Sequence, residues 1–339
     1  VCRGRGVTLA MGEKTFGQKL SRFLKEYSVI VIFVVLCLIF GMLSKNFFSG
    51  SNFITVLRQI SMLCIMCCGC SLVIISGGID LSCGSIASVS GVFWALTMVN
   101  FGMPQWVAIL VALVAGSLFG LINGILITST NMNPMIGTLG MATILQGAAY
   151  LICNGGTPIY GLPEDAKILG QGYLLGIPIP IYIMALCLLV HAFLLFKTRL
   201  GRSMIATGSN AEATRLSGIN SKKIQMISYT LSGLFTAIGG VVLMSRVNSG
   251  QPKAGEEFQM NVITACVVGG VSLAGGEGNT LKLLFGCLIV GVINNGLTIV
   301  QVSEYWQMIA RGAILIFAVA IDAITVLRAE KAKRSIKHS

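Results

Sequence analysis

Long apolar runs separated by short polar stretches constrain the fold of this chain more than any other feature. Runs of about 16 to 24 residues recur between positions 28 and 327, and a helix of ~20 residues crosses a hydrocarbon layer ~30 Å thick. Only 11% of the residues are charged, against roughly 25% in soluble domains. The runs lack the alternating period of membrane β-strands. The chain is therefore predicted to be an all-α polytopic membrane protein.

The hydropathy pattern predicts about ten transmembrane helices. Their expected ranges are 28–43, 54–76, 84–101, 106–127, 134–153, 176–196, 224–247, 259–276, 281–300 and 306–327. Together they form a transmembrane domain over 28–327, between a basic arm at 1–27 and a basic tail at 328–339. Residues 1–10 precede Met11 and are interpreted as an upstream extension.

The positive charge predicts the orientation of the chain in the membrane. The net charge is +12, and most Lys and Arg residues lie in the arm, the segment 197–223 and the tail. The positive-inside bias places all three in the cytoplasm, and six crossings followed by four satisfy this arrangement. The acidic residues Glu257 and Glu304 then lie outside. A nucleic-acid partner is not expected, because no stretch outside the spans is long enough to form a basic face with stacking aromatics.

A glycine-rich pattern occurs twice in the apolar part of the chain. It reads GGIDLSCG at 77–84 and GGVSLAGG at 269–276. Both copies follow an inward crossing, so we expect a parallel internal repeat that relates the first four spans to the last four. Glycine pairs release the backbone from a helix, and repeated broken helices are typical of transporters. Close packing of helices on small residues is the alternative for the second copy.

Polar residues near these glycines are the candidates for a pathway or gate. Asp80 is costly to place in a bilayer, which favours a functional role over a purely structural cap. Asp80 and Ser272 are each expected to cap the helix beyond. Intramembrane amides suit a polyhydroxylated solute, yet they serve equally as hydrogen-bonding contacts between helices. The predicted set is Gly77, Gly78, Asp80, Ser82, Asn123, Gly269, Gly270, Ser272, Asn294 and Asn295.

The internal segment 197–223 contains a second candidate site. Asn210 is a suitable N-cap for a short helix, and Gly218 is a suitable left-handed stop. This helix is interpreted as a docking element for a partner, and a solvated connecting helix is the alternative. The residues expected to take part are Asn210, Glu212, Ala213, Thr214, Arg215 and Gly218.

Enzymatic and metal chemistry find little support in the sequence. The cluster CIMCCGC at 64–70 lies within an apolar run of a chain with only two histidines, so small-residue packing between helices is favoured over a metal or redox site. No metal or other cofactor is expected. The chain has no G-x-x-x-x-G-K-[ST] motif, hence no P-loop of its own, and no catalytic grouping is recognised.

Several motifs in a fixed order resemble one known family. These are GGIDLSCGS at 77–85, GLINGILI at 120–127, NPMIGTLG at 133–140, GSNAEATRLSGIN at 208–220 and VVGGVSLAGGEG at 267–278. The chain resembles, from about residue 27 to residue 327, the membrane-spanning permease of bacterial ribose-type monosaccharide ABC importers. That family also serves xylose, arabinose, galactosides, allose and autoinducer-2.

The resemblance implies a homodimeric permease in the bacterial cytoplasmic (inner) membrane, with both termini in the cytoplasm. It implies a cytoplasmic ABC ATPase subunit, which uses the ATP, and an external or periplasmic sugar-binding protein. In such systems a loop with an EAA-x-x-x-G pattern docks into the ATPase. Glu212, Ala213, Thr214 and Gly218 match it with Thr in place of the second Ala, but the later hydrophobic-Leu-Pro part is not found.

Two other functions are consistent with a polytopic membrane protein. An ion-coupled secondary transporter of a small polar solute would use Asp80 as its coupling site, and its uptake would collapse with the ion gradient. A membrane receptor or scaffold that transports nothing would bind a ligand without solute flux. The sugar carried cannot be assigned from the motifs, since family members share them across substrates.

Overall fold

The computed structural model describes residues 28–337 and is almost entirely helical. Within the described residues, ten helices overlap the ten predicted spans, and the all-α polytopic fold is confirmed. They are α2 (Ser28–Leu43), α3 (Gly50–Ile75), α4 (Cys83–Val99), α5 (Gln105–Thr130), α6 (Pro134–Ile152), α8 (Ile179–Lys197), α11 (Ser221–Val247), α12 (Glu256–Val268), α13 (Thr280–Ile299) and α14 (Glu304–Lys337).

Short elements connect these helices. On one side, η1 (Glu164–Lys167) and α7 (Ile168–Gln171) precede a two-stranded antiparallel hairpin of β1 (Tyr173–Leu174) and β2 (Ile177–Pro178), which pairs Tyr173 with Pro178. Between α8 and α11 lie α9 (Arg199–Ser209) and α10 (Ala211–Leu216).

Helix ends follow local sequence signals. The side chains of Ser49 and Asn133 accept hydrogen bonds from backbone amides in the first turns of α3 and α6, and Pro134 occupies the first turn of α6. In the part of the chain that the structure describes, seven helices are long and apolar enough to span a membrane, and α2 and α4 are shorter apolar helices. The prediction of a span over 259–276 was wrong at its end, because α12 stops at Val268. Gly270 then adopts φ +76°, outside helical geometry.

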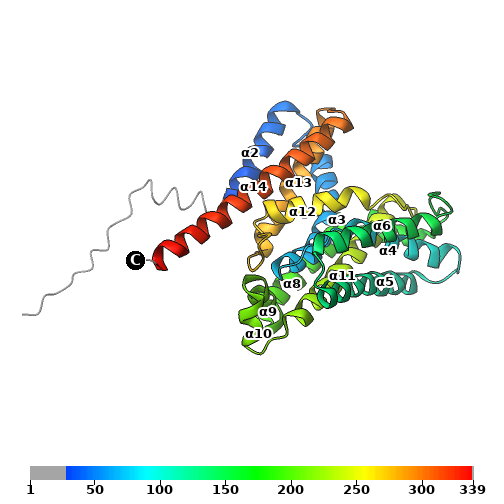
Figure 1. Cartoon of the computed structure of the whole chain (residues 1–339). Coiled ribbons are helices and arrows are strands. Elements are labelled where there is room, and N and C mark those ends of the chain that lie inside the picture. Colours follow the sequence, from blue (N-terminus) through cyan, green and yellow to red (C-terminus); the bar gives the residue numbers. More distant parts are fainter. Residues whose placement is uncertain (1–27, 338–339) are drawn as a thin grey trace, which may run out of the picture.

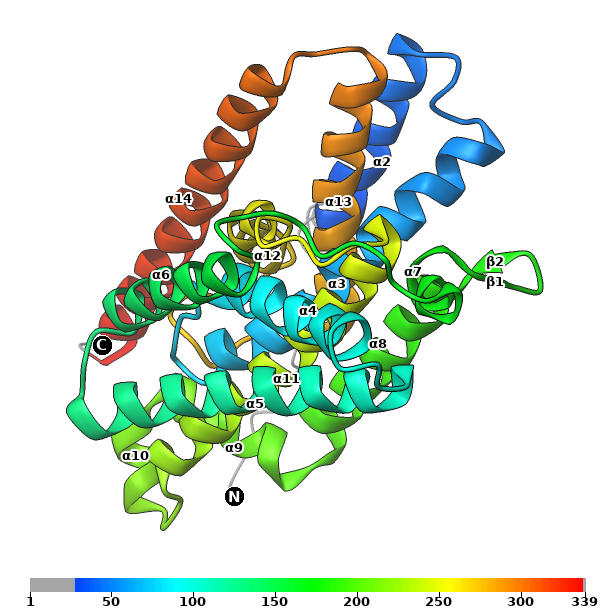
Figure 2. The same cartoon turned by 90° about the vertical axis from the view of Figure 1, so that its right-hand side faces the viewer.

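The helix α11 lies at the centre of the molecule. It packs against α3, α4 and α5, and Figure 2 shows α5 and α11 running close together. In Figure 1, α2, α13 and α14 form one side of the molecule, whereas α9 and α10 lie at the far end of the helical body. The core is dominated by α3, whose residues from Ile60 to Ile75 are buried throughout. The glycine-rich breaks therefore lie next to the most buried helices.

The basic arm at 1–27 lies outside the described residues. The tail is not a separate element, because α14 continues without interruption from Glu304 to Lys337. At 1.5 Å per residue such a helix is about 50 Å long, more than the ~30 Å hydrocarbon thickness. The last turns of α14 therefore extend beyond a bilayer.

Candidate functional site

The first glycine-rich pattern interrupts the helix between α3 and α4. Residues 76–82 are not helical, and Gly77 has φ +85°. Asp80 is completely buried in this break. Its Oδ1 accepts hydrogen bonds from the Ser82 amide (2.9 Å) and the Ser82 hydroxyl (2.5 Å), and its Oδ2 accepts one from the Ser232 hydroxyl (2.9 Å). The carboxylate thus joins the break to α11.

The prediction that Asp80 caps α4 was wrong. Ser82 occupies the N-cap position, and its side chain makes no capping hydrogen bond. The Ser82 hydroxyl does not cap α4 because it is already engaged: it donates to Asp80 and accepts from Asn123 Nδ2 at 2.8 Å. Asp80, Ser82 and Asn123, predicted separately, therefore form one hydrogen-bonded group.

Three residues of α11 that the sequence reasoning missed hold the same break. Gln225 Nε2 donates to the Ser76 carbonyl (3.2 Å), the Tyr229 hydroxyl donates to the Ile79 carbonyl (3.1 Å), and Ser232 binds Asp80. Positions 225, 229 and 232 are spaced by four and three residues and share one helix face. That spacing of polar side chains within an apolar helix was the available signal.

The second glycine-rich pattern also interrupts the chain, between α12 and α13. The segment 269–279 contains no helix. Close packing of helices on small residues, the alternative explanation for this copy, therefore does not account for it by itself. The prediction that Ser272 caps α13 was wrong, since Asn279 caps that helix by accepting from the amides of Leu281 and Lys282. Ser272 instead accepts from the Ala274 amide at 3.3 Å, within the break.

A carboxylate of α14, also missed, holds the second break. Asp322 Oδ2 accepts a hydrogen bond from the Leu273 amide at 3.0 Å. Asn123 in α5 and Asp322 in α14 both lie about five helical turns from the start of their helices, at 3.6 residues per turn. The local sequence around Asn123 is ING at 122–124, and that around Asp322 is IDA at 321–323. In each half, a polar residue at the same place in the neighbouring helix contacts the break, as expected for the parallel repeat.

The two breaks meet each other at the end of α9. The Gly276 amide donates to the Ile75 carbonyl at 2.9 Å. A Cβ added at Gly275 would lie 3.1 Å from Gly77 Cα and 2.9 Å from the Gly208 carbonyl oxygen, and a Cβ at Gly208 would overlap the Ile75 carbonyl. We call this contact of Gly77, Gly208 and Gly275 the glycine junction. It joins both breaks to the segment that carries α10.

The helix α10 is built as the sequence predicts. Asn210 Oδ1 accepts from the Ala213 amide at 2.9 Å, and Gly218 has φ +82°. Thr214 is buried and donates to the Asn210 carbonyl, whereas Glu212, Ala213 and Arg215 are exposed. The Glu212–Arg215 hydrogen bonds lower the pKa of the glutamate and raise that of the arginine. This helix is therefore held rigidly with a charged and accessible outer face.

The predicted amides have different surroundings. Asn295 and Asn52 exchange two hydrogen bonds, of 3.0 and 3.1 Å, which link α13 to α3. Asn294 instead lines a cavity between α3, α12, α13 and α14. The roles of Asn294, Asn295 and the other predicted residues in a pathway stay predictions.

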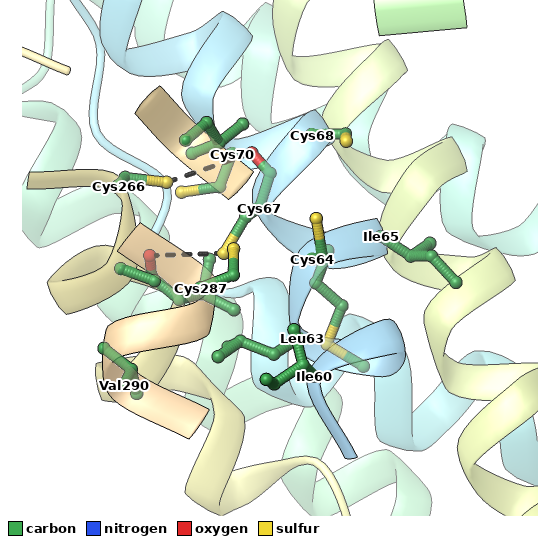
Figure 3. Packing of buried hydrophobic residues seen from close by; sticks show 14 of the residues in the cluster. Ile60, Leu63, Cys64, Ile65, Cys67, Cys68, Cys70, Cys266, Cys287 and Val290 are labelled. Atoms are coloured by element: carbon green, nitrogen blue, oxygen red, sulfur yellow. Dashed lines mark hydrogen bonds between the residues drawn. The ribbon is translucent and has the colours of Figure 1, made fainter. Parts of the chain in front are cut away.

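The cysteine-rich run of α3 packs against α12 and α13 (Figure 3). Cys67 Sγ donates to the Val262 carbonyl (3.6 Å), and Cys266 Sγ donates to the Cys67 carbonyl (3.9 Å). The cysteines between Cys37 and Cys287 are all unbridged. Among the described side chains, residues 29–328, no group of three or more His, Cys, Asp or Glu is arranged to hold a metal ion. The observed contacts are those of small buried side chains.

Comparisons with known proteins give a consistent result. Residues 52–319 match the model of a family described as branched-chain amino acid transport system / permease component. The chain is 37% identical over 315 residues to the ribose import permease protein RbsC of Haemophilus influenzae, covering 92% of this chain and 97% of that protein. No solved structure matches significantly.

Relatives named for other sugars are nearly as similar. Identity to the L-arabinose transport system permease protein AraH of Escherichia coli is 36% over 317 residues, covering 93% of this chain and 94% of that protein. Identity to the galactose/methyl galactoside import permease protein MglC of Escherichia coli is 35% over 336 residues, covering 94% and 99%.

Proposed function

The chain belongs to the family of transport-system permease components, and on this premise we propose that it is the membrane-spanning permease of a monosaccharide ABC importer. The observation that carries the proposal is the 35–37% identity, over more than nine-tenths of the chain, to import permeases for three different sugars. Because the three identities are nearly equal, the proposal names the class of substrate and leaves the individual sugar open.

The energy source is proposed to be a separate ATPase subunit. The chain contains no P-loop sequence. Its α10 offers an exposed, capped helix with the side chains of Glu212 and Arg215 on the outer face. We propose that α10 docks into the ATPase.

The glycine junction supports a route for coupling. ATP binding would bring two ATPase subunits together and shift α10. Gly208 lies three residues before α10 begins at Ala211, and it contacts both breaks. A shift of α9 and α10 therefore changes the positions of Gly77 and Gly275. The breaks would then reshape the pathway in an alternating-access cycle.

Further partners complete the proposal. The importer would contain two copies of this permease and would receive sugar from an external or periplasmic binding protein. The permease is a multi-pass protein of the bacterial cytoplasmic membrane, and we propose that both termini and α10 lie on the cytoplasmic side. This orientation follows the basic residues of the arm, the segment 197–223 and the tail.

Co-purification from native membranes in mild detergent tests the docking helix. The full chain is expected to retain a P-loop ATPase identified by mass spectrometry. Gly218→Pro is expected to lose it, because proline cannot adopt the φ of +82° found there. Gly102→Pro is the matched control, since Gly102 also has positive φ, +61°, but lies in the loop between α4 and α5.

The outcomes separate docking from function. Loss of the ATPase in both variants would indicate general misfolding, and retention in both would contradict docking through α10. Uptake of labelled D-ribose, L-arabinose and D-galactose by cells that express the complete transporter tests the substrate class. If no ATPase is captured and uptake follows an ion gradient instead, the proposed function is wrong.

A further inference from the structure

A polar cavity opens among α3, α12, α13 and α14, away from both breaks. Its volume is about 210 Å³, which corresponds to roughly seven water molecules at ~30 Å³ each. Its polar lining comes from all four helices and includes Gln59, Glu257, Asn261, Asn294, Gln307 and Arg311. Polar and charged side chains that face one another within apolar helices are costly to place in a bilayer, and they usually mark a solute pathway.

Three of the lining amides have no partner in the protein. Among residues 28–337, no hydrogen bond joins the side chain of Gln59, Asn261 or Asn294 to another residue. Asn295, next to Asn294, has both of its side-chain groups bonded to Asn52. Gln307, also at the cavity, donates to the Val302 carbonyl, whereas Gln59, Asn261 and Asn294 present free donors and acceptors to the contents of the cavity.

The cavity extends along α14. Its lining follows α14 from Glu304 to Arg311, a distance of about 10 Å at 1.5 Å per residue. A much smaller space of about 10 Å³ adjoins it, where Thr264, Val290, Ile293 and Ile314 join Asn261, Asn294 and Arg311. The polar lining therefore narrows among apolar side chains beyond Arg311.

The lining favours a neutral polyhydroxylated ligand. Arg311 lies 4.0 Å from Glu257, and Glu304 adds a second carboxylate to the lining, so an anionic ligand is disfavoured. Carboxylates accept and amides both accept and donate, which matches the hydroxyl groups of a sugar. A branched-chain amino acid would instead place an alkyl side chain against amides and charges, leaving them without partners.

We propose that this cavity is a binding site for one monosaccharide, which occupies it after release on the outer side and before passage through the breaks. The proposal rests on the proposed function and adds to it the residues that contact the solute. Gln59, Asn261 and Asn294 bind hydroxyl groups, and Arg311 with Glu257 orients the ring.

Protection from thiol labelling tests occupancy directly. Thr298 is exposed and lines the cavity, whereas Ser303 is exposed and does not. Thr298→Cys and Ser303→Cys are made in the complete transporter in proteoliposomes, and both are labelled with a membrane-impermeant methanethiosulfonate. The imported sugar, among D-ribose, L-arabinose and D-galactose, is expected to slow labelling at position 298 only. L-leucine is expected to protect neither position.

Uptake measurements provide the second test. Gln59→Met removes a free amide from the cavity and is expected to lower uptake about three- to tenfold, as for loss of one or two hydrogen bonds. Gln146→Met is the matched control, because Gln146 donates to the Pro252 carbonyl at 2.8 Å outside the cavity. It is expected to lower thermal stability and to retain uptake per folded protein. ATP hydrolysis stimulated by the binding protein is measured in both, to confirm intact assembly.

The outcomes distinguish this proposal from the proposed function. A wild-type transporter that imports none of the three sugars would contradict the proposed function. If the wild type imports a sugar that does not slow labelling at position 298, and Gln59→Met imports it normally, the cavity is not a solute site. Protection by L-leucine alone would identify an amino acid as the ligand and overturn the assignment to sugars.

Discussion

A buried carboxylate with three hydrogen bonds organises the first break. Asp80 is completely buried, and hydroxyls from the break and from α11 donate to it. Burial of a carboxylate without partners would be very costly. The paired arrangement makes Asp80 structurally important in this conformation, and it leaves open whether the charge itself acts in transport.

Substitution of Asp80 separates these roles. Asp80→Leu leaves three donors unpaired and is expected to lower the free energy of unfolding by about 2–4 kcal/mol. Asp80→Asn keeps one acceptor oxygen for Ser82, and the Ser232 hydroxyl can rotate to accept, so stability should change much less. Thermal unfolding in detergent measures stability, and sugar uptake measures function. Normal uptake by a stable Asp80→Asn variant would rule out a role for the negative charge.

Asp322 is expected to control the order of the second break. Asp322→Ala removes the acceptor of the Leu273 amide, and a hydrogen bond to a charged group contributes about 1.5–3 kcal/mol. Hydrogen exchange of the peptide 270–278 should therefore be roughly tenfold faster or more. Thr325→Ala is the control on the same helix, because Thr325 donates only to the Ile321 carbonyl. Equal exchange in wild type and Asp322→Ala would show that the carboxylate does not hold the break.

The accuracy of prediction at single residues depended on the distance between partners in the sequence. Asp80 belongs to a local glycine-rich motif, so the buried carboxylate was found, although its hydrogen bonds with Ser82 were not predicted. Its other partner, Ser232, lies on α11, far away in the sequence. The spacing of polar residues along that helix marks a shared face but does not reveal which segment the face contacts. The same reasoning explains why Gln225, Tyr229 and Asp322 were missed.

At the scale of elements, the helices were predicted well because length and hydropathy define membrane spans directly. The short α10 was predicted equally well, since Asn210 and Gly218 are strong local signals. The N-caps at Asp80 and Ser272 were not, because capping competes with tertiary hydrogen bonds to Asn123 and Ser232 and with turns inside the break. The glycine junction required three distant segments and had no sequence signal of its own.

The glycine junction predicts that α9 must remain in contact with both breaks. A Cβ in Gly208→Ala overlaps the Ile75 carbonyl, so α9 has to move away from α3. We expect the variant to bind the ATPase through an unchanged α10 but to lose most sugar uptake. ATPase co-purification and uptake are measured together, with Gly312→Ala as the control, where nothing lies within 4 Å of the added Cβ. Full uptake by Gly208→Ala would show that the contact is not needed for coupling.

For the whole molecule, the two proposed sites require a defined orientation in the membrane. The cavity beside Glu257 must open outward to receive a solute, and α10 must face the cytoplasm to meet an ATPase. Figure 1 places α10 at one end of the helical body, and the loop from α13 to α14 lies at the other. The distribution of basic residues predicts the same assignment from the sequence alone, because 197–223 is basic, whereas the α13–α14 loop has no Lys or Arg and is followed by Glu304 at the start of α14.

Thiol labelling in intact cells tests this orientation. Tyr160, in the loop after α6, is 65% exposed, and Leu216, in α10, is 78% exposed. Tyr160→Cys should react with an impermeant maleimide in intact cells, whereas Leu216→Cys should react only after the membrane is opened. Cys2 lies outside the described residues and is replaced by Ser in the parent chain. The described cysteines are buried, apart from the half-buried Cys37, so this parent is expected to give a low background. The reverse pattern would place α10 outside, where no cytoplasmic ATPase can reach it, and would exclude docking through α10 together with entry of solute through the cavity.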